Sequence, residues 1–213
     1  MTQTDPWIQR LAGRFIVFDG PDGSGKTTQF HRLARFAAAA GIEVTEVREP
    51  GGTVIGEEIR NLLLDPANDV MDTRCEVMLY MASRAQLIAE RIRPALRGGH
   101  FVLADRFVSS TLAYQGTAGG IAAADILRIA EIAVGDCWPD LTIIFDVDEA
   151  TAAKRLNPLL DRMEQKGAEY HRRVRQGYLA QAQQMPDKYA VIDARPDAPA
   201  VFTRICETIR SRL

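Results

Sequence analysis

The chain has 213 residues, 46% of them hydrophobic, which is enough apolar content for one α/β domain with a sizeable core. The formal net charge of −2 excludes a general attraction to nucleic acid, and no apolar run approaches the roughly 20 residues of a membrane span, so neither partner is expected. Its 3 cysteines, an odd number, argue against a disulfide framework, and no signal-peptide pattern opens the chain, so a cytoplasmic protein is predicted.

The first predicted element is a buried strand over 15–19, followed by Gly20-Pro-Asp-Gly-Ser-Gly-Lys-Thr27 and a helix over 26–40. This is the P-loop pattern G-x-x-x-x-G-K-[ST] in its strand–loop–helix context. The glycines let the backbone turn its N–H groups around a phosphate, and the helix N-terminus adds donors and a positive dipole end. Lys26 is expected to reach the β- and γ-phosphates, and Thr27 to offer its hydroxyl to Mg²⁺. The pattern therefore predicts a nucleoside-triphosphate site.

A second strand is predicted over 44–48, ending in the breaker cluster Glu49-Pro-Gly-Gly-Thr53, which requires a tight loop before a helix over 54–64. Thr73-Arg-Cys-Glu76 has the form of a capping box. It predicts the start of a long helix to about Arg97, with a bend near Pro94.

Three further strands are expected over 101–104, 141–145 and 189–192, and further helices over 107–114, 122–134, 149–156, about 164–184 and 199–212, with a flexible turn at 116–120. Strands that alternate with helices predict a five-stranded parallel sheet covered by helices on both faces. Ligands bind beyond the carboxyl ends of such strands. This rule brings the P-loop and residues 48–53, 105–115 and 193–196 to one edge of the sheet.

Two pairs of residues near that edge carry suitable chemistry. Asp105 and Arg106 end an apolar strand, where the carboxylate can hold Mg²⁺ or accept a proton and the guanidinium can bind a phosphate. The alternative interpretation is a surface ion pair.

Tyr80 and Arg84 lie four residues apart on one helix face, so the tyrosine ring could stack on a base while the arginine donates a hydrogen bond to it. The alternative is a core tyrosine beside a solvated arginine.

The segment Lys154-Arg155-Leu-Asn-Pro-Leu-Leu-Asp-Arg162 is basic and interrupted by proline. A lid that closes over phosphates needs such a segment, because it must bring arginine to the transferring group and exclude water. The alternative is an ordinary charged loop, and the residues alone do not choose between the two.

Several motifs occur together and in a fixed order: the P-loop, Arg48-Glu-Pro-Gly-Gly-Thr53, Tyr80-Met-Ala-Ser-Arg84, Asp105-Arg-Phe-Val-Ser-Ser-Thr-Leu-Ala-Tyr-Gln-Gly116, Pro139-Asp-Leu-Thr142, Asp161-Arg-Met-Glu164 and Ile192-Asp-Ala194. In this combination the chain resembles thymidylate kinases of the bacterial type over nearly its whole length. The resemblance implies the P-loop nucleoside monophosphate kinase fold, with the whole of 1–213 as one kinase domain and a short lid at about 152–168. It also implies transfer of the ATP γ-phosphoryl group to dTMP, with Mg²⁺, by a homodimer.

The resemblance implies a role for each matching position. The expected ATP-binding residues are Gly20, Pro21, Asp22, Gly23, Ser24, Gly25, Lys26, Thr27 and Thr28. The expected catalytic residues are Lys26, Asp105, Arg106, Arg155 and Arg162, with Thr27 and Asp105 at the metal. The expected substrate-binding residues are Asp22, Pro50, Tyr80, Arg84, Arg106, Ser110, Thr111, Tyr114 and Gln115.

Within the substrate site, the resemblance implies that Asp22 reaches the sugar 3′-hydroxyl, Pro50 follows a cis peptide bond on the pocket floor, and Arg106 holds the dTMP phosphate. Tyr80 would stack on thymine, where the family more often has phenylalanine. Arg84 would donate to a thymine carbonyl, with Ser110 and Thr111 at the remaining base edge. Tyr114 would crowd the ribose 2′ position and favour deoxy sugars.

The chain departs from the family pattern at one position in the P-loop and at one position just before it. Gly23 stands where some members carry an arginine, so the positive charge for the transferring group is expected from the lid, at Arg155 or Arg162. Asp19 stands where glutamate is usual. The lid and the turn at 116–120 also lack arginines that bacterial relatives often carry there.

Two alternatives remain. Within the enzyme class, the acceptor could be another pyrimidine nucleotide, such as dUMP, UMP or CMP. The thymine methyl is only one small apolar group, so discrimination against dUMP is expected to be modest. Outside that class, the P-loop could serve an NTPase switch. A guanine switch would be expected to carry an Asn-Lys-x-Asp stretch after a later strand, and the sequence has none.

Overall fold

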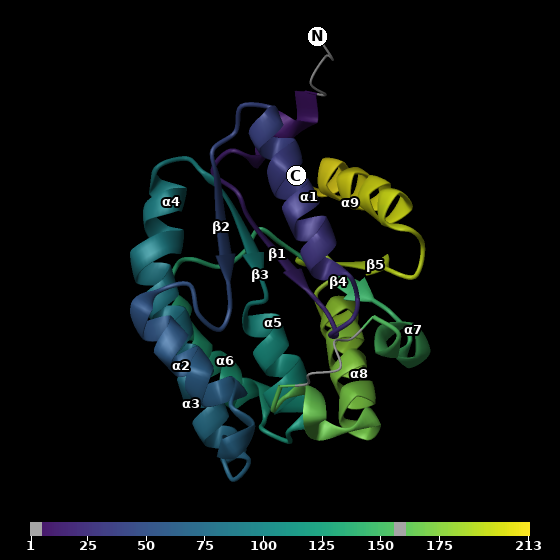
Figure 1. Ribbon diagram of the computed structural model, residues 1–213. Helices are drawn as coiled ribbons and strands as arrows, with labels where there is room; N and C mark the ends of the chain where they lie inside the picture. The colour runs from purple at the N-terminus through teal and green to yellow at the C-terminus, as the bar shows by residue number, and fades with distance from the viewer. Residues whose placement is uncertain (1–5, 156–160) are drawn as a thin grey trace.

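The computed structural model describes residues 6–155 and 161–213, and its centre is a sheet of parallel strands (Figure 1). The strands are β1 (Phe15–Asp19), β2 (Val44–Arg48), β3 (Phe101–Asp105), β4 (Leu141–Asp146) and β5 (Tyr189–Asp193). Their order across the five-stranded sheet is β2-β3-β1-β4-β5, so every connection between neighbours is a crossover. The predicted fold class is confirmed.

Helices lie on both sides of this sheet (Figure 1). They are α1 (Lys26–Ala39), α2 (Val54–Leu64), α3 (Thr73–Leu87), α4 (Arg93–Arg97), α5 (Val108–Thr111), α6 (Ala123–Val134), α7 (Glu149–Ala153), α8 (Ala168–Gln184) and α9 (Ala198–Arg212). Shorter helical turns cover Pro6–Leu11 (η1), Pro66–Asn68 (η2), Ile88–Ile92 (η3), Leu112–Ala118 (η4) and Glu164–Lys166 (η5).

The central strand β1 shows why both faces need a cover. Its side chains alternate, so that Ile16 and Phe18 join a core with α1 and α9, while Phe15 and Val17 join a core with α3, α4 and α6. All five residues of β1 are buried. The strand therefore reads as a continuous apolar run rather than an alternating one, which is typical of a parallel sheet covered on both sides.

Helix α3 begins differently from the capping-box prediction, which was wrong. The N-cap is Asp72, whose carboxylate accepts from the backbone N–H of Arg74 at 2.8 Å. Glu76 is turned into the protein, where it pairs with Arg162 and Lys166. The carboxylate predicted to close the helix end is used in a long-range contact.

The long helix predicted over 73–97 is divided into three parts. The α-helical winding changes to a π-helical turn, η3, at residues 88–92, and α4 follows with Pro94 in its first turn. A proline cannot donate to the carbonyl one turn earlier and its ring needs space there, and a wider turn supplies that space. The bend expected near Pro94 takes the form of this change in winding.

Two other element boundaries differ from expectation. The predicted flexible turn at 116–120 is largely helical, because η4 continues the helix to Ala118 with π-type winding. Helix α8 begins at Ala168 rather than near Glu164, since Gly167 has a φ of 82° that stops the winding between η5 and α8. The end of the predicted 149–156 helix lies outside the described residues, and α7 is described only to Ala153.

The Glu49–Pro50 peptide bond is cis, as the resemblance implied, and it turns the chain at the carboxyl end of β2. Among the described residues, the helices lack the length and apolar character needed to cross a bilayer. The three cysteines, all in the described part of the chain, form no disulfide.

Candidate active site

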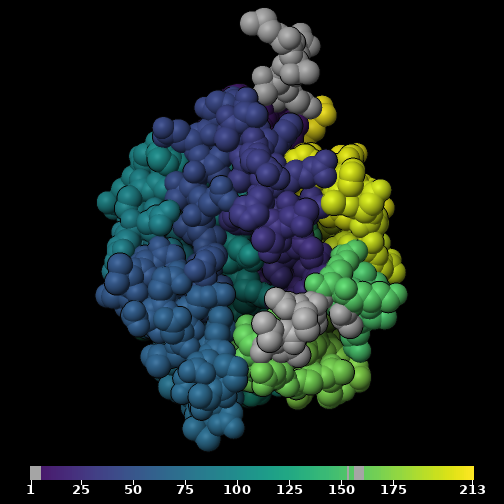
Figure 2. Space-filling view, viewed as in Figure 1, coloured from purple at the N-terminus to yellow at the C-terminus, as the bar shows by residue number. Residues whose placement is uncertain are grey.

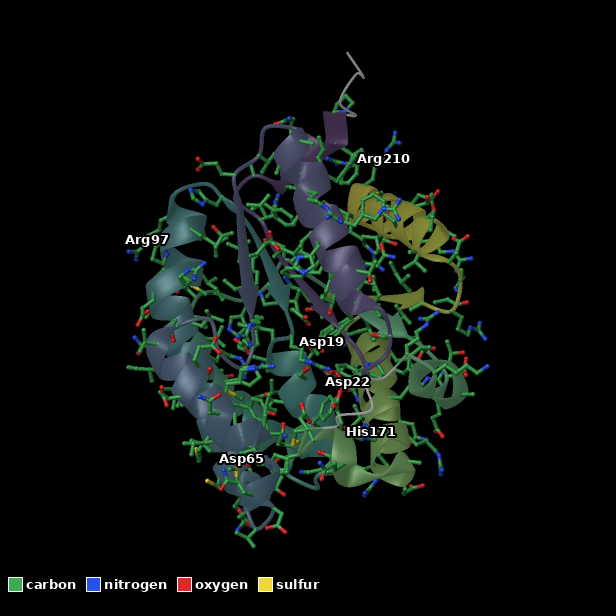
Figure 3. All side chains as sticks on the ribbon, viewed as in Figure 1. Asp19, Asp22, Asp65, Arg97, His171 and Arg210 are labelled. Carbon is green, nitrogen blue, oxygen red and sulfur yellow. The ribbon has the colours of Figure 1, made fainter. Side chains whose placement is uncertain are left out.

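The P-loop lies directly beyond β1, near the centre of the molecule in Figure 3. Lys26 opens α1 and folds back along the loop, where its Nζ donates to the carbonyls of Gly20 and Pro21 at 2.9 and 3.0 Å. Burial lowers the pKa of this amine, as does Arg106, while the nearby carboxylates raise it. The lysine is thus held inside the loop that is built to surround a phosphate.

Gly23 is a position where the structure excludes any side chain. Its φ is 74°, and a Cβ atom there would collide with the backbone of Ala152 in α7. Helix α7 therefore packs against the loop in the place where an arginine side chain would begin. This contact leaves no room for a side chain at position 23 while α7 stays in place.

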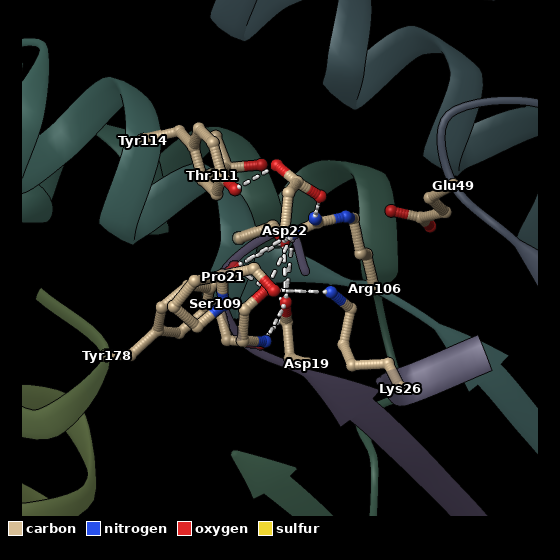
Figure 4. Close-up of polar contacts among 12 residues, drawn as sticks. Asp19, Pro21, Asp22, Lys26, Glu49, Arg106, Ser109, Thr111, Tyr114 and Tyr178 are labelled. Carbon is tan, nitrogen blue, oxygen red and sulfur yellow. Dashed lines mark hydrogen bonds and ion pairs between the residues drawn. The ribbon is translucent and has the colours of Figure 1, made fainter. Parts of the chain in front are cut away.

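Asp22, within the P-loop, forms an ion pair with Arg106, which follows β3 (Figure 4). Tyr114 also donates to the Asp22 carboxylate, with its hydroxyl at 2.8 Å from Oδ2. Burial alone would raise the pKa of Asp22, but the positive charges of Arg106 and Lys26 outweigh it and lower the pKa to about 2. Asp22 is therefore an ionised acceptor at any pH near neutrality.

A buried network below this pair positions Arg106. Asp19 accepts from the hydroxyls of Ser109 at 2.5 Å, Tyr178 at 2.6 Å and Ser110 at 2.7 Å. Ser110 and Tyr178 also contact the Arg106 guanidinium at 3.0 and 3.1 Å. Burial raises the pKa of the Tyr178 hydroxyl, which keeps it protonated as a donor.

Arg106 is also unusual in its backbone, with a φ of 70° in a residue other than glycine. Such a conformation persists only where the surroundings determine it, and it is common at functional sites. Here the side chain is turned toward the P-loop, and Nη1 lies 3.2 Å from the Gly20 carbonyl oxygen.

Two cavities open on either side of the P-loop. The Tyr80 cavity, of about 260 Å³, is lined by Asp22, Lys26, Thr27, Arg48, Glu49, Pro50, Arg60, Leu64, Tyr80, Asp105, Arg106, Ser110, Thr111, Tyr114, Gln115, Asp161, Met163 and Glu164. The Arg155 cavity, of about 530 Å³, is lined by Asp22, Gly23, Ser24, Gly25, Lys26, Thr27, Thr28, Gln29, Arg155, Ala194, Pro196, Asp197, Ala198 and Val201.

The two cavities share Asp22, Lys26 and Thr27 in their walls. Figure 2 shows the hollow between the α2–α3 side of the molecule and the P-loop side, with residues of the teal segment at its floor. Two ligands could therefore meet at the P-loop lysine, one from each side.

The residues predicted to contact the base differ in how they lie relative to the two cavities. Arg84 does not line either cavity. Its side chain is 1% exposed, pairs with Glu49 at 2.5 Å, and contacts the Thr111 hydroxyl at 3.3 Å. Arg84 therefore supports two residues that do line the Tyr80 cavity, and a direct contact between Arg84 and a base stays a prediction.

The remaining predicted substrate residues line the Tyr80 cavity, but they divide into two groups. Ser110 was expected at the base edge beside Thr111, yet its hydroxyl belongs to the Asp19–Arg106 network. Thr111 faces the Arg84 guanidinium instead. The two adjacent residues thus point to different parts of the cavity, because successive side chains on the short helix α5 are about 100° apart.

Asp105 ends β3 and lines the Tyr80 cavity beside Lys26 and Thr27. Its Oδ1 is buried and has no hydrogen-bond partner in the described residues. Buried polar atoms are normally satisfied, so an orphaned carboxylate oxygen facing a phosphate site suits a divalent cation. No group of three or more His, Cys, Asp or Glu side chains in the described part of the chain could hold a metal unaided. Phosphate oxygens would have to complete the coordination.

The two candidate lid arginines have different partners in the structure. Arg155 lines the Arg155 cavity, and its guanidinium donates to the carbonyls of Ala194 and Arg195 at 3.0 and 3.3 Å, beyond β5. Arg162 lines neither cavity and is buried against Glu76, with Nη1 at 2.6 Å from Oε1. The structure thus brings Arg155 to the P-loop and takes Arg162 away from it.

Several site residues were missed in the sequence. Tyr178 comes from α8, and Arg48, Arg60 and Met163 line the Tyr80 cavity without having been predicted to. Arg48 and Met163 lie within motifs that pointed to the site, so their position could have been inferred. Tyr178 lies 159 residues from Asp19, and no local pattern indicates that contact.

Comparison with known proteins now decides the family. The sequence profile described as "Thymidylate kinase" matches residues 18–205. The chain belongs to the thymidylate kinase family. It is 46% identical over 208 residues to a protein named thymidylate kinase from Desulforapulum autotrophicum, covering 93% of this chain and 92% of that one. It is 40% identical over 207 residues to another from Geobacillus sp. (strain WCH70), covering 95% and 99%.

A solved relative has the same fold. The crystal structure of thymidylate kinase from Ehrlichia chaffeensis superposes with a TM-score of 0.78 at 33% identity, covering 93% of this chain and 99% of that chain. Since the relatives match along nearly their whole length, the P-loop, both cavities and helix α8 all fall within the shared part of the thymidylate kinase family.

Proposed function

We propose that the protein transfers the γ-phosphoryl group of ATP to dTMP, giving ADP and dTDP. The observation that carries this proposal is the pair of cavities that share Asp22, Lys26 and Thr27. A switch or simple hydrolase needs one nucleotide site beside the P-loop. A second cavity that borders the same lysine supports a second phosphorylated substrate.

In this proposal, ATP occupies the Arg155 cavity and its phosphates lie in the P-loop. The dTMP phosphate lies at Arg106, in the Tyr80 cavity. A dTMP phosphate oxygen forms a bond to the γ-phosphorus while the bond to the β-bridging oxygen breaks, and ADP leaves with that electron pair. Lys26 and Arg106 supply positive charge where negative charge accumulates. Their rigid placement accounts for most of what such a reaction requires.

Mg²⁺ belongs to the proposal as well. Thr27 and Asp105 would hold it, and the ion would neutralise charge on the phosphates of bound ATP. The orphaned Oδ1 of Asp105 and the position of Thr27 between the cavities support this assignment.

The acceptor is proposed to be a deoxynucleotide with a pyrimidine base. Tyr114 is buried and its hydroxyl is bound to Asp22, so its ring is fixed beside the place of the sugar. Tyr80 offers a ring, and Gln115 and Thr111 offer polar groups, at the other end of the cavity. The small volume of this cavity, about 260 Å³, favours one ring of a base over two.

The test is ADP release with ATP and Mg²⁺, run in parallel with dTMP, dUMP, UMP and CMP. We expect the highest kcat/KM with dTMP, a lower value with dUMP, and values at least about 100-fold lower with the two ribonucleotides. Turnover that is independent of every acceptor would refute the proposal. Equal turnover of UMP and dTMP would refute the role of Tyr114.

Three further parts of the proposal concern the whole chain. We propose that 1–213 acts as one kinase domain in the cytoplasm, where its thiols would stay reduced. Residues 152–168 are proposed to act as the lid, although 156–160 lie outside the described residues. We also propose a homodimer, because α3 packs between α2 and α6 and all three helices expose large apolar side chains.

A further inference from the structure

One buried carboxylate links two segments of the chain that line the Tyr80 cavity. Glu76, in the first turn of α3, has a side chain that is 1% exposed. Its Oε1 accepts from Arg162 at 2.6 Å and from Lys166 at 2.9 Å, and its Oε2 accepts from Gln115 at 2.9 Å. These partners lie 86, 90 and 39 residues away in sequence. A single side chain thus joins three distant parts of the chain.

Arg162 is fully engaged in this contact. Its Nε donates to the carbonyl of Leu63 in α2 at 2.7 Å, and its Nη2 lies 3.8 Å from the sulfur of Met71. Its backbone N–H donates to the Leu64 carbonyl at 3.2 Å. Each guanidinium nitrogen therefore has a partner away from the P-loop, so Arg162 anchors its segment rather than contacting a phosphate.

The 161–166 segment has two sides. Asp161, Met163 and Glu164 line the Tyr80 cavity, whereas Arg162 and Lys166 turn away from it to Glu76. The contact with Glu76 therefore determines where this cavity wall stands. Since an ionised carboxylate only accepts hydrogen bonds, the contact with Glu76 also orients the Gln115 side chain so that its N–H₂ group points toward Glu76.

A second contact joins the same elements. The Lys166 ammonium lies 5.0 Å from the centre of the Tyr170 ring, and the Tyr170 hydroxyl donates to the carbonyl of Tyr114 at 2.7 Å. Burial would raise the pKa of Glu76, but the donors from Gln115, Lys166 and Arg162 lower it below the usual value. The site is therefore suited to a charged carboxylate, also favoured by the N-terminal end of α3.

We infer that Glu76 is a positioning residue, which fixes the 161–166 segment on one side of the Tyr80 cavity and Gln115 on another. As far as the effect on catalysis is concerned, this inference rests on the proposed function. Removing the charge of Glu76 should release the segment and weaken acceptor binding, while the Arg155 cavity, which shares none of these residues, keeps its affinity for ATP.

The first test needs no assumption about the reaction. Both side chains at the Arg162–Met163 bond are buried, so we expect trypsin to cleave this bond slowly in the wild type. In Glu76→Gln, we expect cleavage after Arg162 to be about tenfold faster or more, because a buried charge pair has lost one partner. Lys166→Gln, which removes a partner whose side chain is 25% exposed, should give about a threefold increase. The control, Asp140→Asn, removes an ion pair with Arg14 at the opposite end of the strands and should leave the rate unchanged.

The second test is kinetic. We expect Glu76→Gln to raise KM for dTMP about tenfold, with KM for ATP changed by less than about twofold. Lys166→Gln should also raise KM for dTMP more than KM for ATP, by a smaller factor. A role in global stability alone would lower the melting temperature and leave both KM values unchanged. That result, or cleavage after Arg162 at the wild-type rate in both variants, would overturn the inference. A wild-type enzyme inactive with dTMP would refute the proposed function, while the trypsin test would still decide whether Glu76 anchors the segment.

Discussion

Glu49 shows how a single residue near the site combines burial with incomplete pairing. Its Oε2 pairs with Arg84, but its Oε1 is buried and has no hydrogen-bond partner among the residues that the structure describes. Burial outweighs the attraction of Arg84 and raises the pKa of Glu49 to about 7, against an ordinary value of 4.5. The folded protein therefore holds a proton on Glu49 that the unfolded chain releases at lower pH.

This difference gives a prediction about stability and pH. A raised pKa in the folded state means that its contribution to stability is complete below pH 4.5 and is lost as the pH rises through 7. We expect the free energy of unfolding of the wild type to fall relative to Glu49→Gln by on the order of 1–3 kcal/mol between pH 5 and 8. Urea unfolding of both proteins across this range measures it, and parallel curves would contradict it.

Asp105 allows a prediction about the metal. Replacement by asparagine keeps the shape of the side chain but removes the negative charge of a carboxylate whose Oδ1 has no partner within residues 6–155 and 161–213. We expect Asp105→Asn to raise the Mg²⁺ concentration for half-maximal velocity by about 10–100-fold, because a ligand or a residue orienting metal-bound water has lost its charge. Asp140→Asn should behave like the wild type. An unchanged Mg²⁺ requirement in Asp105→Asn would exclude Asp105 from the metal site.

At the scale of elements, the start of α3 provides a direct comparison. Asp72 caps the helix through the N–H of Arg74, whereas Thr73 was predicted to do so. We expect Asp72→Ala to lower the free energy of unfolding by about 1 kcal/mol, the usual loss for an N-cap acceptor. Thr73→Ala, at the half-buried neighbouring position, should cost less than Asp72→Ala, because the Thr73 hydroxyl is not the N-cap acceptor. Urea unfolding midpoints, compared at equal slopes, measure which variant loses more stability. A larger loss in Thr73→Ala than in Asp72→Ala would support Thr73 as the N-cap, as the capping-box prediction had it.

The elements also show what could be predicted from the sequence. The strands and the helices over 26–40 and 54–64 follow from apolar patterns and glycine or proline breaks, which are local, and the predicted bounds hold within a residue. The P-loop, Asp105 and Arg106 follow from the same rules, because parallel strands collect their ends at one edge. The changes to π-type winding at 88–92 and 112–118 have no local signal of this kind, since they depend on what packs around each helix.

The part of the site that could not be predicted depends on long-range contacts. Arg162 and Arg155 have the same residue type and lie in the same basic segment, so the sequence does not distinguish them. Their roles differ because Glu76 lies near one and the Ala194 carbonyl near the other. Arg84 likewise forms an ion pair with Glu49, 35 residues earlier in the sequence. The helical spacing of Arg84 and Tyr80 cannot indicate this contact.

At the scale of the whole molecule, the exposed apolar side chains of α2, α3 and α6 stand out. Ile132 on α6 is 89% exposed, and Met78 on α3 and Leu62 on α2 are 55% and 51% exposed. Because α3 packs against both other helices, these side chains belong to neighbouring elements. Such a surface supports the proposed homodimer, with a two-fold axis through these helices.

We therefore expect Ile132→Glu to shift the protein from dimer to monomer, because a charge at the centre of an apolar interface loses its hydration. Sedimentation equilibrium measures the dissociation constant, which should increase at least about 100-fold. Val191→Glu, on the edge strand β5 and 45% exposed, is the control and should remain dimeric. A monomeric wild type would refute the dimer, and an unaffected Ile132→Glu would place the interface elsewhere.

The contact between Gly23 and Ala152 also restricts how this protein can evolve. An arginine at position 23 would need both a strained backbone and the removal of α7 from the loop. Yet α7 leads directly into Arg155, so any change that makes room for the first arginine displaces the second. A side chain at position 23 and the present position of Arg155 therefore exclude each other unless α7 moves. Substitutions at Gly23 and in α7 would have to occur together for this protein to place an arginine in the loop.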